Sequence, residues 1–409
     1  MSYTLAGIDV HKKVLMVVLG DVSQPHWKLQ RQRFGTTTPE LKRLADWLTQ
    51  RDTQEVVMES TAQYWKPVWM VLEPHLKLHL AQAQSNRAPR GRKNDFRDAE
   101  RLLRRFVSDE LILSLVPNPQ QRNWRTMTRM KSQLIRDRVR LHNQIESLLE
   151  QMRIKLSSVV SDLLGVSGRR ILAALAAGES DPTKLAALGD ERLRVSKTEL
   201  IDALTGGCDQ MHPSLLGLYL ERLNLLDRQI GDLERMTAEA LKPHEGAVAR
   251  LAEVPGLQPD SAQRIIAEVG PAAEAFATAG NLASWVGVCP GEEESAEKNH
   301  NPRSPKGNKQ MRQILTQVAQ AAVRTNGCHF QAEFRRKLPR LGYAKAIWAT
   351  AHKICRLVWK ILHQGVSYIE YGEYPNPKAR KRRVQKMLQS LRKLGFEVNL
   401  TPLVPQLQQ

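Results

Sequence analysis

The stretch RAPRGRKNDFRDAERLLRR, residues 87–105, places two carboxylates inside a run of arginine and lysine. Asp95 and Asp98 stand three residues apart, so a helix that begins at Asp95 presents both side chains on one face. One interpretation is that Asp95 caps this helix while Asp98 and Glu100 pair with the arginines that follow. The other is that the two acids bind a divalent cation. The rest of the sequence decides between them.

The charge of the chain favours a polyanionic partner. Its 409 residues contain 61 Lys and Arg against 42 Asp and Glu, a formal net charge of +19, and are enough for two or three domains. An excess of this size is typical of proteins that bind nucleic acid. No apolar run approaches a membrane span of roughly 18 residues, and no convincing basic amphipathic helix with bulky apolar anchors is found. We therefore expect a nucleic-acid partner and no membrane.

The cysteines and the first residues favour the cytoplasm. Cys208, Cys289, Cys328 and Cys355 are widely scattered and lack the spacing of a zinc site, which is typical of reduced intracellular thiols. The opening MSYTLAGIDVHKK lacks the charged-then-apolar plan of a signal peptide.

The first part of the chain predicts a mixed sheet covered by helices. From Tyr3 onward, three strand-like runs are separated by polar turns: YTLAGIDV, KVLMVVLGDV and WKLQRQRFG. A helix over 39–50, a strand over 55–61, a helix over 64–74 and a strand over 77–83 follow, and the stretch 87–105 supplies the last helix. The order β-β-β-α-β-α-β-α implies antiparallel strands followed by alternating units, hence a mixed sheet.

Two further carboxylates stand where strands of this sheet end. Asp9 ends the first strand in GIDVHKK, and Glu59 ends the fourth in VVMEST. A lone acid at such a place is usually a solvated turn residue, and His11 is interpreted as an ordinary turn residue, with a phosphate contact as the alternative. Together with Asp95 and Asp98, however, the two acids offer four oxygen donors without His or Cys, a set that suits Mg²⁺ or Mn²⁺. Two such ions assist phosphodiester chemistry.

This order of elements, with acids at these four points, resembles the RNase H/RuvC-like nuclease fold with a DEDD acidic set. GIDVHKK near the start and KNDFRDAERL after the fifth strand resemble the DEDD-type transposases of bacterial insertion sequences, a family that includes the pilin-gene-inverting site-specific recombinase. The resemblance runs from about 6 to 372 and is weakest in the middle. It implies that the metal ligands are Asp9, Glu59, Asp95 and Asp98.

Basic residues beside the acids are candidates for contacts with phosphates that lead into the site. They are Arg87, Arg90, Arg92, Lys93 and Arg97. A solvated basic loop is the alternative. Removing a phosphate contact weakens binding fairly uniformly across sequences and lowers its salt dependence.

Two long helices are expected in the middle of the chain, after Pro117 and Pro119. Residues 120–155 contain no Pro or Gly and have apolar residues at three- and four-residue steps, and 219–233 repeat this pattern. Such heptads predict a coiled-coil hairpin or an intermolecular coiled coil, with an inserted helical piece over 163–213. The region is interpreted as a spacer and oligomerisation element, and its arginine-rich first helix also as a nucleic-acid contact.

The C-terminal part carries two further patterns. LAEVPGLQPDSAQRIIAEVG, residues 251–270, has the pattern of a helix-hairpin-helix, whose turn amides bind phosphate without reading sequence; an ordinary helical turn is the alternative. NLASWVGVCPGEEESAEKNHNPRSPKGNKQMRQIL, residues 281–315, is an apolar segment, a polar loop and a helix that starts near Gly307–Asn308. It resembles the C-terminal transposase domain of the same family, and the matching serine is Ser295. By that resemblance Ser295 forms a covalent phosphoserine intermediate with DNA.

From chemistry alone, Ser295 is a loop serine beside three glutamates, and no obvious general base stands near it. A metal-bound oxygen of the acidic site would serve if the two sites came together, which favours a composite site built from two protomers. Ser304 is the other serine considered in this loop; Ser295 is preferred because its spacing to Gly307–Asn308 fits the family. Candidate phosphate contacts around the serine are Lys298, Arg303, Lys306, Lys309 and Arg312.

We therefore predict an α/β domain followed by mainly helical ones. The parts are a RuvC-like DEDD nuclease domain over 1–115, a coiled-coil spacer over 116–245, a C-terminal transposase domain with the loop serine over 246–375, and a basic tail over 376–409. The tail, with PKARKRRVQKMLQSLRKLG at 377–395, is expected to hold nucleic acid, either as a helix or as a segment that orders on binding.

The resemblance implies a transposase or site-specific recombinase that cuts and rejoins double-stranded donor and target DNA. It further implies guidance by a structured non-coding RNA and work as a dimer or tetramer, in a bacterial cytoplasm at the nucleoid. With base pairing as the reader of sequence, the protein needs mainly backbone contacts. One alternative is a metal-dependent junction-resolving endonuclease that hydrolyses without a covalent intermediate. Another is a non-catalytic nucleic-acid-binding protein.

Overall fold

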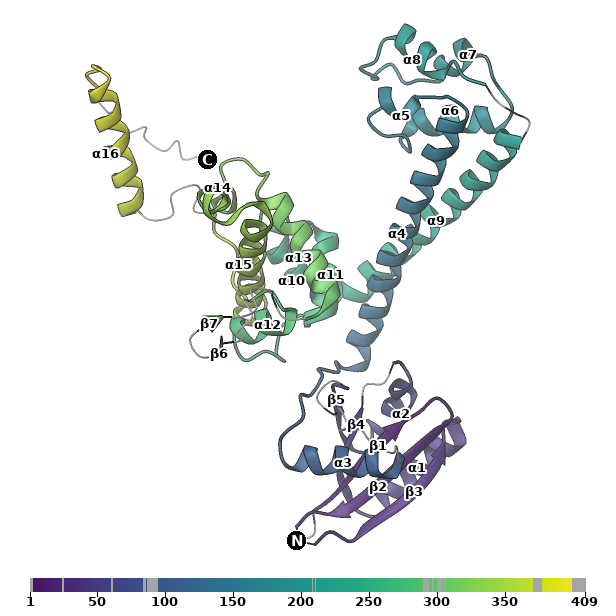
Figure 1. The fold of residues 1–409 in the computed structure, drawn as a ribbon, viewed down its shortest axis with the longest axis vertical. Coiled ribbons are helices and arrows are strands. Elements are labelled where there is room, and N and C mark those ends of the chain that lie inside the picture. The colour runs from purple at the N-terminus through teal and green to yellow at the C-terminus, as the bar shows by residue number, and fades with distance from the viewer. Residues whose placement is uncertain are drawn as a thin grey trace. The chain divides into compact units, whose positions relative to one another are not determined.

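A computed structural model (Figure 1) describes residues 3–23, 26–59, 62–83, 86, 95–207, 209, 211–289, 294–295, 298–299, 304, 307–370 and 377–398. For 294–295, 298–299, 377–380 and 383, it describes the backbone alone. The chain divides into two compact units, Met1–Pro117 and Asn118–Gln409. No helix in the described ranges is long and apolar enough to cross a membrane.

The first unit is a five-stranded mixed sheet with three helices. Its elements are β1 (Thr4–Val10), β2 (Val14–Asp21), β3 (Leu29–Gly35), α1 (Thr38–Thr49), β4 (Thr53–Glu59), α2 (Trp65–Leu72), β5 (Lys77–Ala81) and α3 (Asp95–Val107). The spatial order is β3-β2-β1-β4-β5, with β1 antiparallel to β2 and parallel to β4, and β4 parallel to β5. The predicted order of elements and the mixed sheet are confirmed.

Helices cover both faces of this sheet, because the central strands are apolar on both sides. On one face, α1 and α2 pack against Ile8 and its neighbours; on the other, α3 packs through Ala99 and Leu103. A side chain at Gly7 would place its Cβ 2.5 Å from the carbonyl oxygen of Ala99. The absence of a side chain at Gly7 therefore allows α3 to lie directly on β1, close to Asp9.

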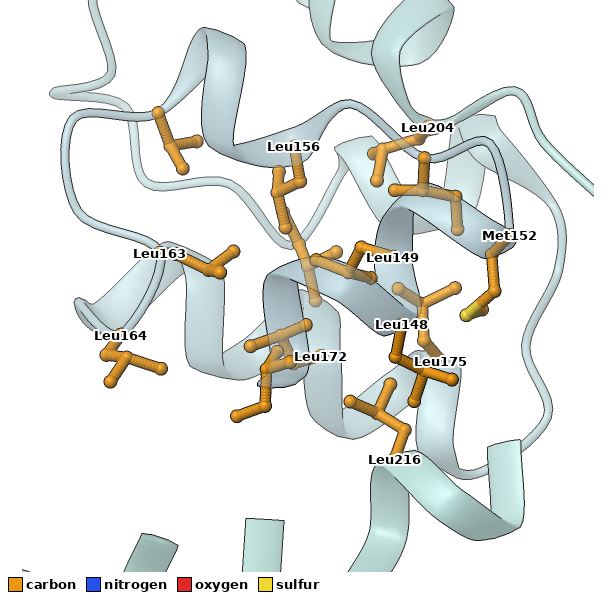
Figure 2. Packing of buried hydrophobic residues seen from close by; sticks show 14 of the residues in the cluster. Leu148, Leu149, Met152, Leu156, Leu163, Leu164, Leu172, Leu175, Leu204 and Leu216 are labelled. Atoms are coloured by element: carbon orange, nitrogen blue, oxygen red, sulfur yellow. The ribbon is translucent and has the colours of Figure 1, made fainter. Parts of the chain in front are cut away.

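The second unit begins with a helical hairpin. The long helices α4 (Pro119–Gln151) and α9 (Met211–Leu241) pair within the chain and run in opposite directions (Figure 1). At the far end of the hairpin lie α5 (Leu156–Val159), α6 (Val166–Ala176), α7 (Pro182–Ala186) and α8 (Lys197–Leu204). Figure 2 shows the leucine-rich core that these short helices share with the long pair, including Leu148, Leu172 and Leu216.

The rest of the second unit contains a helical cluster around α15 (Tyr343–Gln364), followed in the chain by α16 (Pro377–Lys393). The other elements of the cluster are the 3₁₀ turn η1 (Lys242–His244), α10 (Glu245–Ala252), α11 (Pro259–Val269), α12 (Ala279–Val286), β6 (Glu294–Ser295), β7 (Lys298–Asn299), α13 (Lys309–Ala322) and α14 (His329–Leu341). Helices α10, α12, α13 and α14 all contact α15, whose buried face contains Ile347, Ala351, Ile354, Val358 and Ile361. The predicted core face of this helix is confirmed.

Candidate active site

The first pair of acids lies at one edge of the sheet. Strands β1 and β4 are parallel neighbours with Ile8 opposite Met58, so Asp9 and Glu59 follow at adjacent positions. Helix α3 begins at Asp95, and Asp95 and Asp98 both lie in its first turn. Because α3 packs on β1 at Gly7, the two helical acids are held near the end of the same strand.

Electrostatics connect the four acids. Burial raises the pKa of Asp9, and the negative charges of Asp98, Glu59 and Asp95 raise it further, while His11 lowers it. The charges of the other three carboxylates therefore act on Asp9 together. Asp98 also forms a salt bridge with Arg101 at 2.8 Å, and Glu100 forms one with Arg104. The helix-internal ion pairs thus coexist with the acid cluster.

His11 belongs to this cluster, although the sequence favoured an ordinary turn residue. Its Nε2 atom lies 3.1 Å from Oδ2 of Asp9 and 4.0 Å from Oδ1 of Asp95, within ion-pair distance of both carboxylates but not aligned for a hydrogen bond to either. One ligand atom from each of these three residues lies within 4.8 Å of the others. Neighbouring ligands of an octahedral Mg²⁺ stand roughly 3 Å apart and opposite ones roughly 4 Å apart. This limit is slightly wider than the octahedral spacing, so a small movement would bring Asp9, His11 and Asp95 around one cation; Glu59 and Asp98 do not belong to this group of three.

Asn86 is a second residue that sequence reasoning missed. Its side chain is 5% exposed, and its Nδ2 donates a hydrogen bond of 2.8 Å to Oε2 of Glu59. The Oδ1 atom of the same amide is buried and has no partner among the described atoms. Carboxylate and amide oxygens are ligands that Mg²⁺ and Mn²⁺ prefer, so the chemistry of these donors is compatible with the predicted cation.

Of the basic residues predicted beside the acids, Arg97 is exposed in the first turn of α3. The other four lie outside the described residues: Arg87, Arg90, Arg92 and Lys93.

The segment that carries Ser295 is closed at its base by the end of α12 and the start of α13. A Cβ at Gly307 would lie 2.2 Å from the carbonyl oxygen of Val286, so only glycine permits this approach. The backbone N–H of Asn308 donates to Trp285 at 3.1 Å, and its side-chain oxygen accepts from Met311 N at 3.0 Å, which caps α13. The predicted helix start at Gly307–Asn308 is confirmed.

Within the loop itself, the backbone of Ser295 in β6 pairs with Lys298 in β7. The side chains of both residues lie outside the described part, as do Arg303 and Lys306 altogether. The alternative serine, Ser304, accepts a hydrogen bond from Arg312 at 3.3 Å.

The two basic residues predicted in α13 differ in their surroundings. Lys309 is exposed in the first turn, where it can reach a phosphate. Arg312 also donates to the carbonyl oxygen of Gly287 at 2.9 Å and stacks over the ring of Trp348. Arg312 therefore closes the base of the loop, in addition to any contact with nucleic acid.

Two regions of the chain match known protein families. Residues 6–154 match a family model described as a transposase, of the DEDD type, and residues 248–335 match the transposase IS116/IS110/IS902 family. The chain belongs to the IS110 family of insertion-sequence transposases. The first match contains the four acids of this IS110-family transposase, and the second contains Ser295 and the loop base.

Two relatives align along much of the transposase. A protein of Pseudomonas aeruginosa strain PAO1, whose name assigns it to the family 20 transposases, is 25% identical over 383 residues, 90% of this chain and 99% of the relative. A protein of Sinorhizobium fredii strain NGR234, named as transposase y4pF/y4sB, is 23% identical over 316 residues, 75% of this chain and 72% of the relative.

Proposed function

We propose that this IS110-family transposase is a site-specific recombinase that cuts and rejoins donor and target DNA through a covalent bond to Ser295, assisted by the acidic site. The observation that carries the proposal is the occurrence, in one chain, of an acid cluster and of a loop serine with a closed base. Asp9, with its raised pKa, Glu59, Asp95 and Asp98 belong to the first. Gly307 and Asn308 close the second.

In the acidic site, the four acids and His11 would hold Mg²⁺ or Mn²⁺, and Asn86 orients Glu59 through its hydrogen bond. The bound ion would stabilise the negative charge that develops on a DNA phosphate. The order of strands around these acids supports assignment of residues 1–115 to the RNase H/RuvC-like fold.

At the serine, Oγ would form a bond to phosphorus while the bond to one DNA oxygen breaks and that oxygen takes up a proton. A DNA hydroxyl would later attack the same phosphorus and release the serine hydroxyl. One phosphoester replaces another in each step, so the strands are rejoined without ATP. Because the acids and Ser295 belong to different units, we infer a composite site to which two protomers of a dimer or tetramer contribute.

The remaining parts would bind nucleic acid. Residues 116–245 would act as spacer and oligomerisation element, and 246–375 as the transposase domain with a helix-hairpin-helix at α10–α11. The basic tail over 376–409 would add contacts to the phosphates. The side chains proposed to contact phosphate are Arg87, Arg90, Arg92, Lys93, Arg97, Lys298, Arg303, Lys306, Lys309 and Arg312.

We also infer a structured non-coding RNA that guides the enzyme to its sites, in the cytoplasm of a bacterium at the nucleoid. The net charge of +19 supports binding of RNA and DNA together. Base pairing would then read the sequence, while the protein contacts backbones.

A cleavage assay tests the proposal. The full chain is expressed with the non-coding DNA that flanks its gene, purified with any bound RNA, and incubated with a nicked duplex that carries the element's junction. We expect a covalent protein–DNA adduct that is lost in Ser295→Ala, persists in Ser304→Ala and does not form when the enzyme is treated with ribonuclease before the DNA is added.

Each other outcome removes a part of the proposal. An adduct that still forms after ribonuclease treatment of the enzyme contradicts the RNA guide, and one lost only in Ser304→Ala shows that Ser295 is the wrong serine. Free DNA ends without an adduct in any variant would favour the junction-resolving endonuclease that hydrolyses with the acidic site alone.

A further inference from the structure

A buried carboxylate connects the first turns of α4 to the base of the serine loop. Glu268, near the end of α11, is 1% exposed. Arg129 of α4 binds both of its oxygens, with Nε 2.7 Å from Oε1 and a terminal nitrogen 2.8 Å from Oε2. The side-chain amide of Asn308 donates to Oε2 at 3.0 Å. One carboxylate thus bridges α4, α11 and the cap of α13.

A second arginine strengthens the attachment of α4. Arg125 donates to the carbonyl oxygens of Ala267, at 3.2 Å, and of Glu268, and its side chain is 11% exposed. Burial lowers its pKa to about 10, which leaves the guanidinium charged at neutral pH. Gln121, one turn earlier, donates to the same Ala267 oxygen at 3.1 Å. The start of α4 is therefore held on the end of α11 by polar contacts over about three turns.

The choice of residue at 308 goes beyond helix capping. Asn308 uses its oxygen to cap α13 and its nitrogen to contact Glu268, because an amide has an acceptor and a donor on two separate atoms. Aspartate caps a helix equally well but would bring a second carboxylate against Glu268. The position therefore requires an amide because of Glu268, and not because of the cap.

We propose that Glu268 is a positioning residue that sets the serine loop relative to α4. Helix α4 is the first helix of the second unit and follows the unit that contains the four acids. The inference rests on the proposed role of Ser295. Arg129 and Arg125 fix the carboxylate, the carboxylate orients Asn308, and Asn308 holds both Trp285 and the first turn of α13, between which the loop runs. The position of the loop is thereby coupled to α4, which follows the first unit in the chain.

A donor–acceptor swap tests this coupling. Asn308→Asp retains the cap but places two carboxylates together, and Glu268→Gln removes the charge that the two arginines share. Each single variant should lower the rate of adduct formation at least about tenfold. In the double variant, the amide now at position 268 can donate to the carboxylate now at position 308, but the same amide nitrogen faces the Arg129 nitrogen that bonds Oε2 in the wild type. The rate should therefore rise above that of both single variants without reaching the wild-type rate. A double variant no faster than the faster single variant overturns the proposal.

The matched control is Asn118→Asp. Asn118 caps α4 through a 2.8 Å bond from Gln121 N, but it is exposed and has no carboxylate contact of this kind among the described residues. This substitution should leave the adduct rate unchanged. Mn²⁺ binding at the acidic site should be the same in all variants, because the acids lie in the other unit.

A second readout keeps the inference separate from the proposed function. Exchange of the Asn308 backbone amide, which donates to Trp285, should be faster in each single variant and slower again in the double variant. The Met311 amide, which donates to the cap that aspartate retains, should stay protected in Asn308→Asp. If wild type forms no adduct that depends on Ser295, the proposed function fails, and the exchange rates alone decide the positioning role. Unchanged exchange of the backbone amide at position 308 in Asn308→Asp would overturn it.

Discussion

The ionised carboxylate of Asp9 lowers the stability of the folded protein. Its pKa is raised by burial and by three neighbouring acids, so the folded chain disfavours the ionised carboxylate relative to the unfolded chain. Below the ordinary pKa of aspartate, Asp9 is protonated in the folded and the unfolded chain and costs no stability. As the pH rises through the raised pKa, the carboxyl ionises in the folded chain, and the loss of folding stability grows. A site that is costly without a cation is expected where binding is the purpose.

Replacing Asp9 by asparagine should therefore stabilise the metal-free protein. We expect Asp9→Asn to raise the melting temperature by a few degrees at neutral pH, and by less as the pH falls toward the ordinary pKa. Mn²⁺ should stabilise wild type but not the variant, since it binds only the intact site. Thermal unfolding with and without Mn²⁺ measures both effects. Asp46→Asn, at an exposed position of α1, is the control and should change neither. A variant less stable than wild type would show that Asp9 is not repelled.

The residues of the site differ in how far the sequence reveals them. That the four acids lie near one another could be predicted, because strand ends and helical spacing are local patterns; their role as metal ligands stays a prediction. Asn86 and Glu268 could not, because their partners are distant: Asn86 is 27 residues from Glu59, and Glu268 is 139 residues from Arg129. Sequence periodicity describes neighbours along one element and carries no information about such tertiary pairs.

At the scale of elements, the heptads of α4 explain only part of its packing. Leu141, Ile145 and Leu148 are buried in the core with α9 as predicted, yet Met130 is 53% exposed. The adjacent Lys131 is buried instead and pairs with Asp260 of α11. The first half of α4 contacts α11 through charged groups, so its pattern is set by polar partners that periodicity does not detect.

The contact between α14 and α15 offers a test of buried charge at this scale. Glu333 is 5% exposed; burial alone would raise its pKa, but hydrogen bonds from Lys337 and Lys353 outweigh this and lower it. A lowered pKa stabilises the fold above the ordinary glutamate pKa and ceases to do so as the pH falls through the lowered value. Glu333→Gln should cost about 2 kcal/mol at neutral pH and less in acid.

Chemical unfolding at pH 7 and near pH 4 measures that difference. The exposed Glu239→Gln in α9 should change stability by less than about 0.5 kcal/mol at either pH. Equal losses for Glu333→Gln at both values would mean that its charge contributes nothing.

For the whole molecule, the division after Pro117 has consequences for how the chemistry is distributed. The sheet unit has its own apolar clusters on both faces, and its acids, His11 and Asn86 all lie within it. A unit of the length of residues 1–117 buries roughly two thirds of its surface on folding, which is enough for a hydrophobic core of its own. The sequence predicted this sheet because strand and helix patterns alternate cleanly along the first unit.

Residues 1–117 expressed alone should therefore fold and bind Mn²⁺ as the full chain does, but form no adduct with DNA. Cooperative thermal unfolding and electron paramagnetic resonance of bound Mn²⁺ measure the first two properties. The Asp9→Asn fragment, which should fold without binding Mn²⁺, is the matched control. Loss of Mn²⁺ binding in a folded wild-type fragment would mean that the second unit supplies a ligand, and an adduct with the fragment would exclude Ser295 as the nucleophile. Retained binding without an adduct separates the two halves of the reaction, with the cation held by one unit and the attacking oxygen supplied by the other.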